Sequence, residues 1–242
     1  MSQAYFITGT DTDAGKTTIT AGLLCAAKQQ GRTTLAMKPV ASGCEMTPQG
    51  LRNSDARALI AQSTVQLPYS QINPYAFAPA IAPHIAAQDV GVELRVTDLY
   101  QAAQVVLQAQ ADFTLIEGAG GWRVPISANE YLSDFAIALN LPVILVVGVK
   151  LGCINHALLT VEAIRNDGLE LVGWVANVVD PDCARLAENI EFLKQHISAP
   201  CLATVPHLEA ATAEHVAEYL QSNDSNTILT SHQSAYATNS KL

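Results

Sequence analysis

The sequence contains few charged and few aromatic residues, and it has no long apolar run. Charged residues make up 14% and aromatic residues 6% of the 242 positions, whereas hydrophobic residues make up 49%. The hydrophobic share excludes a largely disordered chain, and the scarcity of aromatics predicts a core of Ala, Val, Ile and Leu, as in parallel α/β proteins. No apolar stretch reaches the roughly 20 residues that a membrane-spanning helix needs.

Basic residues and paired cysteines are also lacking. Lys and Arg number 13 against 22 Asp and Glu, giving a net charge of −9, so nucleic acid is not an expected partner. The five cysteines are scattered without a C-x-x-C pair, which predicts reduced thiols and neither a disulfide framework nor a zinc site. The N-terminus lacks the pattern of a signal peptide. These absences predict a soluble cytoplasmic protein without a membrane partner.

Apolar strand-like runs alternate with helical stretches along the chain. The predicted strands are 5–8, 34–37, 113–116, 142–149, 171–177 and 201–205, and the predicted helices are 16–30, 99–111, 155–166 and 184–196. Such alternation predicts an α/β fold with a mostly parallel central sheet and helices on both faces. We expect one domain over 1–220 and a polar, flexible tail over 221–242. The connection over 39–95 is long, with one clear helix near Ser54, and long connections are often functional.

A glycine-rich loop with the sequence GTDTDAGKT follows the first predicted strand, at residues 9–17. The common phosphate-binding loop is G-x-x-x-x-G-K-[ST], whereas here five residues separate Gly9 from Gly15. Gly15 lets backbone N–H groups surround a phosphate, Lys16 neutralises the outer phosphates, and the hydroxyl of Thr17 can ligate Mg²⁺. The N-terminus of the following helix favours the same anion. The loop therefore predicts nucleotide binding.

Two acidic residues are candidates to hold the metal ion of such a site. Glu117 ends a predicted buried strand and is followed by Gly118-Ala119-Gly120-Gly121, the usual place of the second metal anchor in phosphate-loop enzymes. The alternative is an ordinary loop carboxylate. Asp55 lies in the first turn of the predicted helix near Ser54, where the helix dipole alone also favours an acid.

A second lysine and a second anion site point to a charged acceptor. Lys38 ends the second predicted strand, where open α/β sheets bind ligands, although a solvated strand end is the alternative. One lysine suffices for ATP hydrolysis, so Lys38 beside Lys16 suggests phosphate transfer to an anion. The amides of Gly152 to Asn155 open a predicted helix and form either a second anion site or a plain loop. The histidines show no ligand spacing, and no G-x-S-x-G turn occurs.

The motifs together resemble the dethiobiotin synthetase family. The matching segments are GTDTDAGKT at 9–17, KPVASG at 38–43, GLRNSDA at 50–56, EGAGGW at 117–122, PVILVVGVKLGCINHALLT at 142–160 and GWVAN at 173–177. They follow the family's order over nearly the whole predicted domain, and the longer loop is itself a family trait. The resemblance implies a homodimer with a P-loop fold that uses Mg²⁺ and ATP. It also implies that 7,8-diaminononanoate and CO₂ form a carbamate, which ATP phosphorylates before the neighbouring amine closes the ring of dethiobiotin.

The resemblance also implies a role for each matching residue. Lys16 and Lys38 would be catalytic, and Thr17, Asp55 and Glu117 would ligate the metal. The nucleotide site would comprise Asp13, Ala14, Gly15, Lys16, Thr17, Thr18, Asp55, Glu117, Gly118, Ala119, Gly120, Asn177, Val178, Pro206, His207 and Leu208. The substrate site would comprise Thr12, Lys38, Ser42, Gly152, Cys153, Ile154 and Asn155, with the last four binding the distant carboxylate across the dimer interface.

Departures from the family pattern and rival functions leave some alternatives open. Asp13-Ala14 stands where the family often has Glu-Val, and either Glu209 or Glu214 could contact the nucleotide.

Two rival functions are considered beside this resemblance. One rival is a cobyrinate-type amidating enzyme, which usually carries a glutamine amidotransferase domain that this chain has no room for. The other is an ATP-switch protein of the partitioning-ATPase type. Those proteins have a lysine just after the first loop glycine, where this chain has Thr10 and Asp11.

Overall fold

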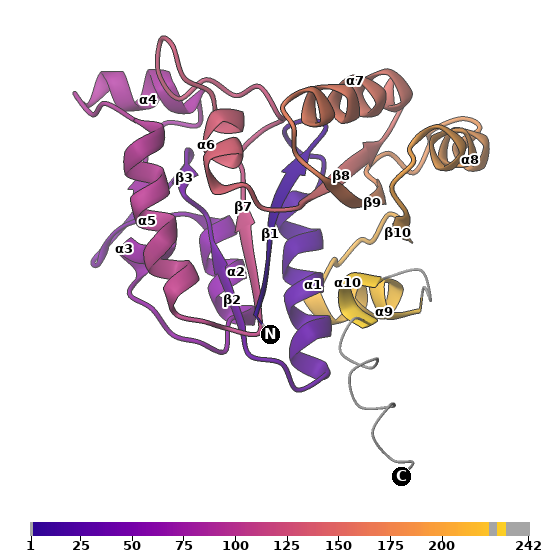
Figure 1. The fold of residues 1–242 in the computed structure, drawn as a ribbon, viewed down its shortest axis with the longest axis horizontal. Coiled ribbons are helices and arrows are strands. Elements are labelled where there is room, and N and C mark those ends of the chain that lie inside the picture. The colour runs from indigo at the N-terminus through magenta and orange to yellow at the C-terminus, as the bar shows by residue number, and fades with distance from the viewer. Residues whose placement is uncertain (1, 223–226, 231–242) are drawn as a thin grey trace.

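A six-stranded parallel sheet forms the centre of the protein in a computed structural model that describes residues 2–222 and 227–230 (Figure 1). The strand order is β10-β9-β8-β1-β7-β2, and every pair is parallel. The strands are β1 Gln3–Gly9, β2 Thr34–Met37, β7 Phe113–Glu117, β8 Val143–Val149, β9 Leu171–Val178 and β10 Cys201–Val205. All six correspond to predicted strands, so the predicted fold class is confirmed.

The most apolar run of the sequence lies near the middle of the sheet. Every residue of β8 is buried, because helices cover both faces of this strand. Beside it, β1 pairs with β7 in a register that places Ile7 opposite Glu117. The phosphate loop after Gly9 and the carboxylate of Glu117 therefore emerge at the same edge of the sheet, where its parallel strands end.

Helices cover the two faces of the sheet in two separate layers (Figure 1). The helices α1 Lys16–Gln29, α2 Ser54–Gln62 and α9 Ala213–Gln221 form one layer, in which α1 contacts both of the others. The opposite layer contains α5 Val96–Gln108, α6 Leu132–Leu139, α7 Cys153–Asn166 and α8 Leu186–His196. Leu23 and Leu24 of α1 are fully buried in the first layer, as are Leu99 of α5 and Phe135 of α6 in the second. None of the helices described is long and apolar enough to cross a membrane.

The long connection over 39–95 is more ordered than the sequence predicted. Besides the expected α2, it contains the short helices α3 Tyr69–Ile72 and α4 Pro83–Asp89. It also forms two small sheets, which pair β3 Val40–Ala41 with β6 Tyr75–Ala76 and β4 Glu45–Thr47 with β5 Gly50–Arg52. These elements are two to seven residues long, too short for a hydrophobic period to show in the sequence.

Some helix boundaries differ from prediction, and two longer helices were not predicted. Helices α5, α7 and α8 begin three residues before, two before and two after the predicted starts. The unpredicted α6 has eight residues and is apolar. Its first turn is held by Asp134, whose Oδ2 accepts the Tyr131 N–H at 2.7 Å. The other unpredicted helix is α9, whose Thr212 cap accepts the N–H of His215.

The predicted tail over 221–242 lies mainly outside the described residues. Within it, Gln221 ends α9, and residues 227–230 form the short helix α10 Thr227–Thr230. Ile228 and Leu229 of α10 are buried in the hydrophobic cluster that contains Leu220. The guanidinium of the buried Arg32 donates to the carbonyl of Ile228 at 3.5 Å. Residues 223–226 and 231–242 are not described.

Candidate active site

The phosphate loop connects β1 to α1 and has left-handed backbone conformations at two positions. Gly15, the residue before α1, has φ of +87°, and Asp13 has φ of +60°. Left-handed conformations are unfavourable for residues with a Cβ other than Asn and Asp, so this local geometry favours the residue types found here. The loop also packs closely on β8, because a Cβ at Gly148 would lie 3.0 Å from Cα of Ala14. The small residues Ala14 and Gly148 therefore allow the loop to lie against the sheet.

Asn177, at the end of β9, closes the loop from the other side. Its Nδ2 donates to the carbonyl oxygen of Ala14 at 3.0 Å. A Cβ added at Gly15 would lie 2.1 Å from the same nitrogen, so glycine is required there by contact as well as by conformation. The predicted base-reading residue thus also fixes the phosphate loop.

Lys16 is buried against the phosphate loop. Its Nζ donates to the carbonyl of Asp11 at 2.9 Å, inside the curve of the loop. Burial, and then the positive charge of Lys38, lower the pKa of Lys16 to about 8, against the opposing influence of nearby carboxylates. A phosphate bound in the loop would add negative charge and stabilise the protonated lysine.

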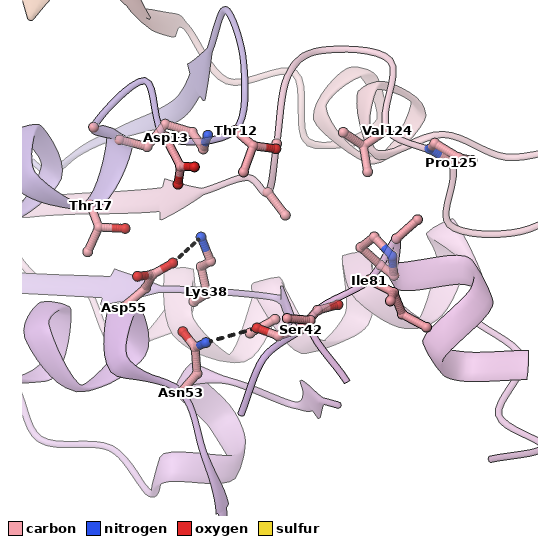
Figure 2. A pocket seen from close by; sticks show the side chains of 18 of the residues that line it. Thr12, Asp13, Thr17, Lys38, Ser42, Asn53, Asp55, Ile81, Val124 and Pro125 are labelled. Carbon is pink, nitrogen blue, oxygen red and sulfur yellow. Dashed lines mark hydrogen bonds and ion pairs between the residues drawn. The ribbon is translucent and has the colours of Figure 1, made fainter. Parts of the chain in front are cut away.

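Lys38 forms ion pairs with both predicted metal-binding carboxylates, and Figure 2 shows its contact with Asp55. Its Nζ is 2.7 Å from Oε1 of Glu117 and 3.1 Å from Oδ2 of Asp55, and it donates to the carbonyl of Gly118 at 3.1 Å. Burial alone would lower the pKa of Lys38, but Glu117 and Asp55 together raise it above its ordinary value. The ammonium therefore stays charged and neutralises both acids.

Three oxygen groups converge where the metal ion was predicted. Thr17 donates its hydroxyl to Oε1 of Glu117 at 2.7 Å, and Oε2 of Glu117 is buried without a hydrogen-bond partner. Buried acceptors are normally satisfied, so this oxygen fits a missing ligand. A hydroxyl and two carboxylates suit a Mg²⁺ ion that is otherwise held by nucleotide phosphates. Such a set differs from a cage of three or more acidic, His or Cys side chains, and no such cage occurs in the described part of the chain.

A cavity of about 830 Å³ opens beside these groups (Figure 2). The predicted residues that line it are Thr12, Asp13, Gly15, Lys16, Thr17, Thr18, Lys38, Ser42, Asp55, Ala119 and Gly120. Glu117 and Gly118 lie behind this wall, where both are bonded by Lys38. The Oγ of Ser42 is buried without a hydrogen-bond partner, so it can form a hydrogen bond with a ligand in the cavity.

Part of the cavity wall was not predicted. It comprises Ala41, Asn53, Ala80, Ile81, Ala82, Pro83, Arg123, Val124 and Pro125. Ile81 faces Val124 and Pro125 across the cavity and gives this end an apolar surface (Figure 2). The guanidinium of Arg123 is bound by Asp167 at 2.8 Å, which holds the loop after β7 in place. The length of the 39–95 connection was a signal in the sequence for the part of this wall at residues 41–83, but not for Arg123, Val124 and Pro125.

A second pocket, of about 220 Å³, lies on the other side of the phosphate loop. Five predicted nucleotide-binding residues line it, namely Asn177, Val178, Pro206, His207 and Leu208. Val179, Val205 and Ala211 complete its apolar wall, whereas Glu209 and Glu214 are exposed and do not line it. Asp13, Gly15 and Thr18 border both pockets, so the loop joins them into one site.

The predicted carboxylate-binding group, Gly152 to Asn155, is not brought into the main cavity of its own chain. Gly152 precedes α7 with φ of +92°, and Cys153 is buried beneath the helix start. This loop is connected to the phosphate loop through the half-exposed ion pair of Lys150 with Asp11, with Nζ 3.2 Å from Oδ2.

The fold and this site define a P-loop nucleotide-binding protein. Solved structures share the architecture at low sequence identity. A MinC:MinD cell division complex from Aquifex aeolicus aligns with a TM-score of 0.61 and 13% identity over 95% of this chain and 96% of that chain. Cobyrinic acid a,c-diamide synthase from Mycobacterium smegmatis, with bound ADP and magnesium, aligns with a TM-score of 0.58 and 17% identity over 91% and 93%. These similarities concern the fold alone.

Sequence comparison places the chain within one family of such proteins. Residues 3–215 match a family model described as an AAA domain. The ATP-dependent dethiobiotin synthetase BioD of Pseudomonas aeruginosa (strain LESB58) is 63% identical over 217 residues, which cover 90% of this chain and 95% of that protein. The proteins of the same name from Cellvibrio japonicus and Xanthomonas campestris (strain 8004) are 60% and 49% identical over 218 residues, or 90% of this chain and 95% and 97% of theirs. The chain belongs to the dethiobiotin synthetase family, which confirms the resemblance and does not favour the ATP-switch alternative.

Proposed function

We propose that the protein converts 7,8-diaminononanoate, CO₂ and ATP to dethiobiotin, ADP and phosphate. The observation that carries this proposal is the presence of Lys16 and Lys38 at one cavity, in a chain 63% identical to a dethiobiotin synthetase. A carbamate and the γ-phosphate are both anions and repel each other as they approach. Two cations at their meeting point offset that repulsion, and the fixed loop aligns the reacting groups.

The reaction needs positioning more than covalent help from the protein. An amine of the diamine attacks CO₂ and loses a proton to give a carbamate, and a carbamate oxygen then attacks the γ-phosphorus, releasing ADP. The neighbouring amine attacks the carbonyl carbon of the resulting anhydride, and phosphate leaves as the cyclic urea forms. Lys38 and Ser42 hold the carbamate, Thr12 lies beside the diamine, and Lys16 binds the transferred phosphate.

The nucleotide and the metal would occupy the remaining groups. Thr17, Asp55 and Glu117 would hold Mg²⁺, which supplies charge neutralisation on the phosphates when bound. The backbone of Gly118 to Gly120 borders the phosphate site. The second pocket would receive the adenine, with Asn177 and Val178 on one side and Pro206 to Leu208 over the base. Once the metal neutralises the two carboxylates, Lys38 is no longer required as their counter-charge.

The direct test is a reconstituted reaction with purified protein, the diamine, bicarbonate and Mg²⁺·ATP. We expect ADP and dethiobiotin to form in equal amounts, as measured by a coupled ADP assay and mass spectrometry. Leaving out the diamine or the bicarbonate should abolish both products. ADP release that does not depend on the diamine would contradict the proposal.

We further propose that the active form is a homodimer whose partner supplies Gly152 to Asn155 to the substrate's carboxylate. These residues do not line the cavity of their own chain. Leu151 and Leu159, at and near the start of α7, are 90% and 57% exposed, which supports an interface there. A mixture of Lys38→Gln and Asn155→Ala proteins tests this, since mixed dimers would hold one intact site and restore about a quarter of the activity. No recovery would contradict a shared site.

The cysteines of the protein are consistent with a reducing compartment. Four cysteines, Cys25, Cys44, Cys153 and Cys183, have free thiols. We therefore propose a cytoplasmic location, because cytosolic proteins keep their thiols reduced. Fractionation of cells that express the protein would test this, and recovery in an oxidising compartment would contradict it.

A further inference from the structure

Three hydrogen bonds connect the end of β2 with the start of α2 through two side chains outside the cavity wall. The backbone N–H of Asn53 donates to the Tyr69 hydroxyl at 2.7 Å, and that hydroxyl donates to Oδ1 of Asn73 at 2.9 Å. Nδ2 of Asn73 then donates to the backbone carbonyl of Lys38 at 2.7 Å. We call these three bonds the Tyr69–Asn73 bridge.

Each end of the Tyr69–Asn73 bridge carries a residue of the active site. At one end is Lys38 itself. At the other, Asn53 caps α2 by accepting the N–H of Ala56 at 3.1 Å, and Asp55 lies in the turn that this cap fixes. The ion pair of Lys38 with Asp55, at 3.1 Å, closes the ring (Figure 2). The bridge therefore constrains the distance between these two functional groups.

Three of the four residues of the bridge are buried, Tyr69 is partly buried, and further contacts hold Tyr69 and Asn73 in place. Asn53, Asn73 and Lys38 are 4%, 2% and 4% exposed. Nδ2 of Asn73 also reaches the carbonyl of Tyr75 at 3.3 Å, and the guanidinium of Arg52 lies 4.1 Å from the centre of the Tyr69 ring. Removal of the Tyr69 hydroxyl would leave the N–H of Asn53 and Oδ1 of Asn73 without this partner, and unmatched buried groups drive local rearrangement.

We propose that Tyr69 and Asn73 are positioning residues for the reaction, acting through the placement of Lys38 and Asp55. Neither lines either pocket of the site. The inference rests on the proposed function only for the identity of the phosphate acceptor. The placement of Asp55 also affects how Mg²⁺ binds together with ATP, and this effect does not depend on the acceptor. Binding of ATP without metal depends on the phosphate loop and on β9 and β10, at the other side of the sheet.

The test compares Tyr69→Phe with Tyr75→Phe, a matched change at a neighbouring tyrosine whose hydroxyl is outside the bridge. We expect Tyr69→Phe to lower kcat about tenfold and to raise the Mg²⁺ concentration needed for half-maximal ATP binding by a similar factor, as one lost buried hydrogen bond allows. Binding of ATP in EDTA should stay at the level of the unchanged protein. Tyr75→Phe should leave all three measurements unchanged.

A purely structural role predicts a different result. If Tyr69→Phe lowers the melting temperature and the EDTA affinity for ATP while kcat and the Mg²⁺ requirement hold, the proposal is overturned. Asn73→Asp provides a second measurement, because it keeps the acceptor for Tyr69 but places an oxygen against the carbonyl of Lys38. It should lower kcat at least as much as Tyr69→Phe, and full activity would overturn the proposal.

These measurements also separate this inference from the proposed function. The Mg²⁺ dependence of ATP binding is measured without diamine. If the unchanged protein formed no dethiobiotin, the proposed function would fail, whereas a raised Mg²⁺ requirement in Tyr69→Phe would still support the bridge. If the unchanged protein formed dethiobiotin but Tyr69→Phe kept the same Mg²⁺ requirement, the positioning role of the bridge would be rejected and the proposed function would stand.

Discussion

The Nζ of Lys38 and the Oε1 of Glu117 lie 2.7 Å apart, and both side chains are buried. Each charge alone would be costly to bury, and the pair is stable because each neutralises the other. The lysine assigned to the carbamate is thus also the counter-charge of the predicted metal site. This double role leads to the first two predictions.

Replacement of Lys38 by glutamine should abolish the reaction without abolishing ATP binding. In Lys38→Gln we expect dethiobiotin formation to be lost while ATP binding persists, because the loop and the second pocket are intact. The metal-free protein should lose about 3 kcal/mol of unfolding free energy, since Glu117 is left buried without its cation. Mg²⁺·ATP should restore part of this loss in thermal melts. Lys194→Gln, on the exposed surface of α8, is the control; loss of ATP binding in Lys38→Gln would reject the role at the carbamate.

Glu117→Gln should raise the metal requirement of the enzyme. The change removes a carboxylate beside Thr17 while leaving the side chain's size and one oxygen in place. We expect the Mg²⁺ concentration for half-maximal activity to rise about tenfold or more, with ATP affinity in EDTA unchanged. Titration of activity with Mg²⁺ at saturating ATP measures this. Glu162→Gln, an exposed change on α7, should behave like the unchanged protein, and an unaltered Mg²⁺ curve in Glu117→Gln would exclude it as a ligand.

Gly15→Ala should abolish nucleotide binding, and Gly31→Ala provides a close control. Both glycines have left-handed backbones, with φ of +87° and +80°, so alanine costs about 1 kcal/mol at either position. Only at Gly15 would the new Cβ meet Asn177, at 2.1 Å, whereas nothing lies within 4 Å at Gly31. Calorimetric titration with ATP should detect no binding to Gly15→Ala and normal binding to Gly31→Ala. Equal loss in both would show that backbone strain, and not the contact, is responsible.

Asn177→Ala should weaken the preference for adenine. Nδ2 of Asn177 is engaged by the carbonyl of Ala14, which leaves Oδ1 to accept a hydrogen from the 6-amino group of adenine. We expect ATP affinity to fall about tenfold and the affinity for inosine triphosphate, which lacks that amino group, to fall less. The ratio of the two dissociation constants in both proteins measures the effect. An unchanged ratio of dissociation constants would show that Asn177 supports the phosphate loop but does not recognise adenine.

The residues proposed to carry the chemistry have local signatures in the sequence, and several of them lie at or after the end of a predicted strand. Lys38 follows β2, Glu117 ends β7, and Lys16 begins the helix after the loop that follows β1. The parallel arrangement places the ends of these three strands at one edge of the sheet. The predicted strands were confirmed for the same reason: in a parallel sheet covered on both faces, β8 is a continuous apolar run.

The supporting residues could not be predicted in this way. Tyr69 and Asn73 lie in the 39–95 connection, where elements are too short to show a period, and their role depends on contacts between segments 16 to 35 residues apart. The apolar wall at Ile81 and Val124 joins two loops that are distant in sequence. In the proposed homodimer, the contribution of Gly152 to Asn155 would depend on a second chain, and this assignment stays a prediction.

The two pockets on either side of the phosphate loop are lined by largely separate segments of the chain, so the proposed function assigns donor and acceptor recognition to different segments. Residues at and after the ends of β9 and β10 line the smaller pocket, whereas residues after β2 and β7 and in the 39–95 connection line the larger one. Because the two sets share little beyond the loop, the choice of phosphate donor and the choice of acceptor can diverge independently. A change of nucleotide preference can thus arise by substitutions near the C-terminal strands, while the diamine chemistry is retained unaltered.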